Sequence, residues 1–322
     1  LCDRRQRQMC IRDSYITRPN FSEQAYGDYL DLARASLGKE KSPKALFAER
    51  ADSVKYGGHP WLRRATPATL DRFDREAARR LYDKLFGNVA DFVFFFAGEM
   101  PAAEARPLVE KYIGSLPAAP KRKFAKTDFR IVPGAAEYDA VVPGAVTPKS
   151  SIERIYHGRF DYTPENYAAL RYVTYILGAR YLTTVREEKG GTYGVRVQGS
   201  TKYIPRETYS MTISFDTNEE MADELREIVM KEIEEIAANG PKSEDIEKNR
   251  EFMLKSWKNS LEQNAGWMNY LNSKYGSGLD YLADYEEVLK TLTDADVQAM
   301  AKKVLADGNL VKVIMRPAKE EA

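Results

Sequence analysis

Arg186 and Tyr193 are the side chains whose types and spacing point most directly to chemistry. They flank Gly190-Gly191 in the segment 185–195, where a helical pattern ends and a strand pattern begins. The double glycine reverses the chain, so a guanidinium and a phenol hydroxyl can reach the same end of a sheet. There they could hold a peptide carbonyl and stabilise developing negative charge. A structural role stays open, because the helix dipole favours an arginine in the last turn and Tyr193 is one of twenty tyrosines.

Other catalytic arrangements are missing from the sequence. The two histidines, His59 and His157, are far apart and belong to no H-x-x-x-H or H-x-x-E-H pair that could bind zinc. Both cysteines, Cys2 and Cys10, lie within the first fourteen residues, so the rest of the chain has no cysteine ligand or nucleophile. We expect His59 to pack in a loop against Trp61 and His157 to be exposed or hydrogen-bonded at the end of a strand. The chain has no G-x-S-x-G, Walker or dinucleotide glycine motif.

Composition restricts the partners. The chain has 322 residues, enough for two domains, and 49 Lys and Arg against 48 Asp and Glu give a net charge of +1. A nearly neutral chain has no general attraction for nucleic acid or an anionic membrane, so we expect neither as a partner. The longest apolar run, Phe92–Ala97, has the length of a buried strand and is far shorter than a membrane span.

The composition also changes along the chain and divides it into four segments. Residues 1–14 carry no apolar pattern, and we expect a non-native or disordered segment there, with the true N-terminus missing. Residues 15–120 form the first domain. Prolines are frequent among Lys, Ala and Gly in 121–150, which predicts a linker. Residues 151–322 form the second domain.

Strand alternation in the second domain predicts the fold class. Tyr209, Met211, Ile213 and Phe215 alternate with polar residues, as in a sheet with one packed face and one wet face, which favours antiparallel pairing. Helices should cover the packed face, and capping boxes are expected at Thr217-x-x-Glu220 and Thr293-x-x-Asp296. The prediction is an α+β fold of mostly antiparallel sheets packed against helices. The same order of helix, loop and strand is predicted near the end of both domains, and this weak internal repeat indicates repeated domains.

The segment around Arg186 and Tyr193 resembles the arginine-tyrosine motif in the C-terminal half of pitrilysin/insulinase-type zinc metallopeptidases, the inverzincins. The apolar run 92–98, followed by 108–117 with its Leu-Pro ending, resembles the end of a domain in the same family. Short stretches at 147–150 and 240–242 are similar to bacterial members built from four domains. The resemblance covers about residues 45–317.

The resemblance implies the C-terminal part of the third family domain in 15–120 and the whole fourth, non-zinc-binding domain in 151–322. In the family, each domain is an α+β sandwich, so this chain would hold one partial and one complete domain. Complete enzymes enclose a chamber between two bowl-like halves, and the N-terminal half binds zinc through H-x-x-E-H and a distal glutamate. That motif is absent here. Only Arg186 and Tyr193 carry over, as residues for substrate binding and transition-state support, and no metal or cofactor ligand does.

The expected function is therefore the C-terminal, substrate-binding half of a zinc-dependent endopeptidase that hydrolyses peptides, inactive by itself. Its partners would be a peptide substrate and the N-terminal zinc-binding half, in the same chain or in a separate subunit. The alternative is a non-catalytic partner or scaffold subunit of a two-chain peptidase-like complex. A peptide-binding module outside the family is a third interpretation. Family analogy favours the bacterial periplasm or the cell exterior.

Overall fold

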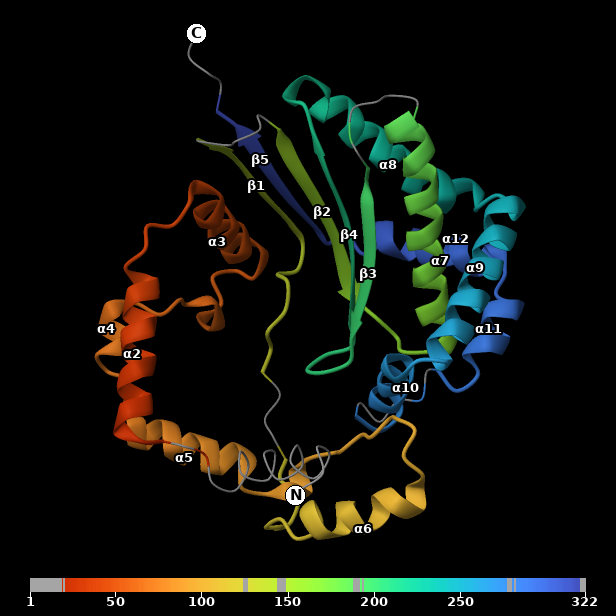
Figure 1. The fold of residues 1–322 in the computed structure, drawn as a ribbon. Coiled ribbons are helices and arrows are strands. Elements are labelled where there is room, and N and C mark those ends of the chain that lie inside the picture. The colour runs from red at the N-terminus through yellow and green to blue at the C-terminus, as the bar shows by residue number, and fades with distance from the viewer. Residues whose placement is uncertain are drawn as a thin grey trace. The chain divides into compact units, whose positions relative to one another are not determined.

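The computed structural model describes residues 19, 21–123, 127–143, 149–187, 192, 194–276, 280 and 282–318. The chain divides into two compact units (Figure 1). Unit 1 comprises residues 1–40 and 63–125, and unit 2 comprises residues 41–62 and 126–322. This division differs from the boundaries expected at 120 and 150, because 41–62 and part of the expected linker belong to unit 2.

Unit 1 is helical in the residues described. Its α-helices are α2 (Glu23–Leu37), α4 (Pro67–Leu70), α5 (Arg75–Phe86) and α6 (Ala102–Tyr112). The strand predicted at Phe92–Ala97 is wrong, since the run has no strand assignment and both Val93 and Phe96 are 49% exposed. A strand needs a neighbour to accept its backbone hydrogen bonds, and the described part of unit 1 offers none.

Two buried polar side chains that follow α5 hold the segment 119–122, which comes after α6 in unit 1. The Asn88 side-chain oxygen accepts a hydrogen bond from the Ala119 backbone N–H at 2.7 Å, and its Nδ2 donates to the Pro120 carbonyl at 3.3 Å. Asp91 accepts from the backbone N–H of Arg122 at 2.7 Å and from its Nε at 2.5 Å. These hydrogen bonds hold the pKa of Asp91 below its ordinary value, and the bond from the Arg122 backbone N–H has the largest effect.

Unit 2 contains a five-stranded sheet in the order β1-β5-β2-β4-β3. The strands are β1 (Ala135–Val142), β2 (Ser150–Arg159), β3 (Arg196–Lys202), β4 (Thr208–Thr217) and β5 (Leu310–Pro317). β1 pairs with β5 in parallel, and the other three pairings are antiparallel. The mostly antiparallel sheet was predicted. β1 was not, because it lies within the expected linker.

Helices cover one face of this sheet, as predicted. They are α7 (Pro164–Tyr181), α8 (Ala222–Asn239), α9 (Ser243–Leu261), α10 (Asn264–Leu271), α11 (Tyr285–Thr291) and α12 (Asp294–Ala306). α7 and α12 pack on the sheet, and α8 packs on both (Figure 1). Along β4 the predicted apolar residues are buried and the residues between them are partly exposed, apart from Thr217 at the strand's end. The α+β prediction is therefore confirmed.

The opposite face of the sheet is covered only in part. The helix α3 (Pro43–Lys55) packs over β1 and β5, where Ala51 joins Ile155, Val311 and Val313 in a small buried cluster. This contact explains why 41–62 belongs to unit 2. Over β2, β4 and β3, no helix among the described residues of unit 2 covers this face (Figure 1).

The two expected capping boxes have different outcomes. Thr293 and Asp296 form the predicted reciprocal pair at the start of α12. The box at Thr217 is wrong, because Thr217 is still paired in β4 and the 3-10 turn Glu219–Met221 separates it from Ala222, where α8 begins. A cap must directly precede the first helical turn, so strand pairing overrides the local pattern here.

Candidate functional site

Arg186 lies in a π-helical turn, Leu182–Glu187, that directly continues α7. Such turns are rare and are frequently found at functional sites. Only the backbone of Arg186 is described, and Tyr193 lies outside the described residues. The meeting of the two side chains therefore stays a prediction.

The end of α7 that leads into this turn is anchored firmly. Arg180 is 13% exposed at its side chain and forms ion pairs with Asp245 of α9 at 2.9 Å and with Glu232 of α8 at 3.4 Å. The neighbouring Tyr181 is fully buried, and its hydroxyl donates to the Val229 carbonyl at 2.7 Å. Two helices, α8 and α9, thus fix the last turn of α7, so the π-helical turn starts from a rigid support.

A cavity of about 620 Å³ lies on the uncovered face of the sheet, entirely within unit 2. Two rows of strand-paired residues form its floor. Each row has one residue from β2, one from β4 and one from β3: His157, Ser210 and Ser200 in one row, and Arg159, Thr208 and Lys202 in the next. Side chains of directly paired residues share a face of the sheet. The floor therefore carries the hydroxyl groups of Ser210, Ser200 and Thr208. In the second row, Thr208 lies between two cations, Arg159 and Lys202.

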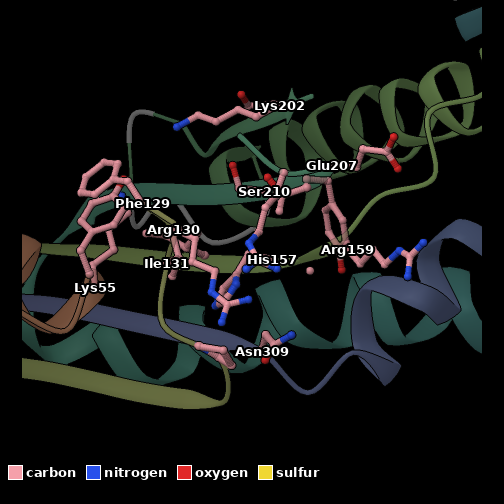
Figure 2. A pocket seen from close by; sticks show the side chains of 18 of the residues that line it. Lys55, Phe129, Arg130, Ile131, His157, Arg159, Lys202, Glu207, Ser210 and Asn309 are labelled. Atoms are coloured by element: carbon pink, nitrogen blue, oxygen red, sulfur yellow. The ribbon is translucent and has the colours of Figure 1, made fainter. Parts of the chain in front are cut away.

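The wall of this cavity comes from the end of α3 and from the segment 129–133. Tyr56 stacks on Phe129 with ring centroids 4.7 Å apart. Beside them, His59 meets Trp61 edge to face at 5.7 Å, which confirms the packing predicted for His59. Figure 2 shows Lys55 and Phe129 on one side of the cavity and Asn309 below His157.

His157 was expected to be exposed or hydrogen-bonded at the end of a strand, and the expected exposure is wrong. It is only 7% exposed, and its Nε2 is buried without a hydrogen-bond partner in the residues described. Because β2 is a central strand, with β4 on one side and β5 on the other, its end lies inside the sheet. Burial lowers the pKa of His157; Asp307 opposes this shift and Lys55 adds to it. The imidazole is therefore neutral at pH 7.

Positive charge dominates the cavity. Five basic side chains and one carboxylate line it: Lys55, Arg130, Arg159, Lys202, Arg206 and Glu207. Asp128 neutralises part of this charge through ion pairs with Arg206 at 2.7 Å and Arg130 at 3.5 Å. In the part of the chain that is described, neither Lys55 nor Lys202 has an ion-pair partner.

The sequence signal for this site was weak. Its cations come from four separate segments of the chain, and no spacing pattern links these segments. Within the described ranges, no group of three or more His, Cys, Asp and Glu side chains could hold a metal ion. Among the same residues, no helix has the length and apolar character needed to cross a membrane.

Solved structures with the same fold include proteases and an inactive peptidase domain. The chain matches the ferredoxin protease FusC, solved in complex with Arabidopsis ferredoxin, at a TM-score of 0.76 and 18% identity, over 97% of this chain and 34% of that one. It matches the periplasmic protease PqqL from Escherichia coli at a TM-score of 0.74 and 17% identity, over 92% of this chain and 33% of that one. For a peptidase M16 inactive domain from Pseudomonas fluorescens the TM-score is 0.74 and the identity 21%, over 99% of this chain and 77% of that one.

Sequence comparison gives the same family. A zinc protease PQQL-like protein of Arabidopsis thaliana is 21% identical over 318 residues, which cover 93% of this chain and 33% of the relative. The chain thus spans about a third of that relative's length. Residues 72–253, more than half of the chain, match the family described as the peptidase M16 inactive domain. The resemblance to pitrilysin/insulinase-type peptidases is thereby confirmed, and the chain belongs to the peptidase M16 family through its inactive domain.

Proposed function

We propose that this chain is the C-terminal, substrate-binding half of a zinc-dependent endopeptidase that hydrolyses peptides in a closed chamber. The observation that carries the proposal is the match of residues 72–253 to a family domain described as inactive. A relative named as a zinc protease contains a region like this chain in about a third of its length, which leaves room for a separate catalytic half. In this proposal the N-terminal half holds the zinc, and this chain supplies groups that bind the peptide.

Arg186 and Tyr193 are the groups proposed to act on the peptide. A guanidinium and a phenol hydroxyl can both donate hydrogen bonds to a carbonyl oxygen, and these bonds strengthen as that oxygen gains negative charge. Two features support this role for Arg186: its place in a π-helical turn and the anchoring of the preceding helix by Arg180. The rigid support matters, because a donor contributes to catalysis only when it is already aimed at the reacting atom.

The test is to change these residues in the complete protein. Arg186→Ala and Tyr193→Phe should each reduce peptide turnover by roughly a hundredfold, the usual cost of losing one such donor. The zinc content, measured by atomic absorption, should not change. Arg106→Ala is the matched control, because the Arg106 side chain is 81% exposed on α6. Full turnover in both variants would contradict the proposed roles.

A second candidate is a non-catalytic partner or scaffold subunit of a two-chain peptidase-like complex. The chain covers 77% of the Pseudomonas fluorescens structure, so M16 chains of comparable length have been solved. This candidate predicts a separate gene for the zinc-binding half and co-purification of the two products. A single reading frame that encodes both halves would exclude it.

We also propose a periplasmic or extracellular location. The support is the structural match to PqqL, which is described as a periplasmic protease. Fractionation of cells that express the full-length gene with a C-terminal tag would test this, and recovery of the tag only with cytoplasmic markers would contradict it.

A further inference from the structure

The cavity on the uncovered face of the sheet has the features of a built binding site. Its volume of about 620 Å³ lies in the range of sites for small ligands or short peptide segments. The floor is made of strand-paired residues, whose positions the sheet holds firmly. Aromatic rings from Tyr56 and Phe129 form part of the wall.

His157 provides the independent sign that a ligand is accommodated here. More than nine-tenths of the residue is buried, yet its Nε2 has no partner among the described residues. Figure 2 shows its ring between Ser210 and Asn309, among the side chains that line the cavity. A buried polar atom without a hydrogen bond costs free energy. A ligand atom in the cavity would remove that cost once a small side-chain movement opened Nε2, which is itself buried, to the cavity.

The surrounding groups define the chemistry of this ligand. Lys55 and Lys202 line the cavity without ion pairs in the described residues, and Arg159 has only the exposed Asp161 at 3.5 Å. A neutral imidazole with its hydrogen on Nε2 donates one hydrogen bond, and Ser210 can donate another. Cations and donors together suit an acceptor that carries negative charge. Among groups of a peptide, only a carboxylate meets both conditions.

We propose that this cavity binds a carboxylate of the peptide that the protein handles, with Lys55, Lys202 and His157 as the binding groups. The proposal rests on the proposed function for the presence of a peptide and on the cavity itself for the choice of group. The carboxylate can belong to an acidic side chain or to the C-terminus of the peptide. Such binding makes this half of the protein selective for peptides that place a carboxylate in the cavity.

Binding of three eight-residue peptides to the 322-residue chain tests the proposal by fluorescence anisotropy with a neutral fluorophore. The first peptide has one glutamate and both ends blocked. In the second, glutamine replaces the glutamate. The third is the glutamine peptide with a free C-terminal carboxylate. We expect the first or the third to bind about three- to tenfold more tightly than the second, and the tighter of the two identifies the source of the carboxylate.

Variants of the protein locate the binding. Lys202→Gln and Lys55→Gln should each reduce the preference for a carboxylate about threefold or more, and Lys202→Glu should abolish it. Lys202 is exposed, so its replacement should leave the fold intact, as thermal unfolding would verify. Lys255→Gln is the control, because Lys255 is exposed on α9 and does not line the cavity.

The outcomes separate this proposal from the proposed function. Equal affinity for all three peptides, or a carboxylate preference that survives Lys202→Glu, would overturn the cavity proposal and leave the peptide-binding role standing. Failure of every peptide to bind would contradict both. A carboxylate preference lost in the lysine variants and kept in Lys255→Gln would establish the cavity as the site.

Discussion

Gly158→Ala should destabilise unit 2, because Gly158 in β2 lies directly against the side chain of Asp307, the residue that follows α12. A Cβ built on Gly158 would lie 2.9 Å from the Asp307 Cγ, closer still to its Oδ2, and 3.0 Å from Cε1 of Tyr209. Real carbon atoms do not approach so closely, so the carboxylate must move away. Its movement would break the hydrogen bond that the Tyr209 hydroxyl donates to Asp307 Oδ2 at 2.9 Å.

Two opposing effects set the magnitude. A hydrogen bond to a charged group contributes about 1.5–3 kcal/mol, and Tyr209 is 2% exposed, so water replaces the lost partner poorly. Replacing glycine by alanine restricts the unfolded chain and returns about 0.4–1 kcal/mol. The expected net loss in the free energy of unfolding is therefore about 1–2 kcal/mol. The ion pair of Lys303 with Asp307 at 3.0 Å limits the loss if the carboxylate keeps that contact.

Urea unfolding followed by tryptophan fluorescence measures this loss, because all three tryptophans (Trp61, Trp257 and Trp267) belong to unit 2. Tyr209→Phe removes the same hydrogen bond without crowding. If the two changes act through one bond, the double variant should lose clearly less than the sum of the single losses. A neutral Gly158→Ala, or additivity within about 0.3–0.5 kcal/mol, would refute the reasoning.

Three further predictions concern the stability of unit 2, each measured by the same urea unfolding. Arg180→Ala leaves Asp245 and Glu232 without their cation and should cost about 2 kcal/mol, less than a fully buried pair because these carboxylates are partly exposed; a loss below about 0.5 kcal/mol would show that the pair contributes as little as a surface pair. Leu225→Ala empties a fully buried position and should cost about 2–5 kcal/mol, and an unchanged urea midpoint would contradict the described core. The lowered pKa of His157 means that the unfolded chain takes up a proton first: its contribution is constant above about pH 6.5, the ordinary value, and stability falls as the pH drops below it toward the folded-state pKa. His157→Gln should flatten that fall, and an equally steep fall in the variant would assign it to other groups.

Local patterns determined the parts of this fold that depend on neighbours in the sequence. The alternation along β4 identified its buried residues, because side chains of a strand point to opposite faces in turn. The Thr293 box marked the start of α12, because a cap needs only residues within one turn. The segment around Arg186 and Tyr193 identified the family for a similar reason, since a motif is a short run of residues.

Only the tertiary structure decided what depends on partners far along the chain. The run Phe92–Ala97 looks like a strand, but pairing requires a neighbour and the described part of unit 1 supplies none. β1 looks like a linker and becomes a strand because β5, some 175 residues later, pairs with it. His157 is buried because β2 is central in the sheet, and the cavity that it lines brings together cations from four segments. Such proximity depends on strand order and register, and neither can be predicted from the spacing of residues along the chain.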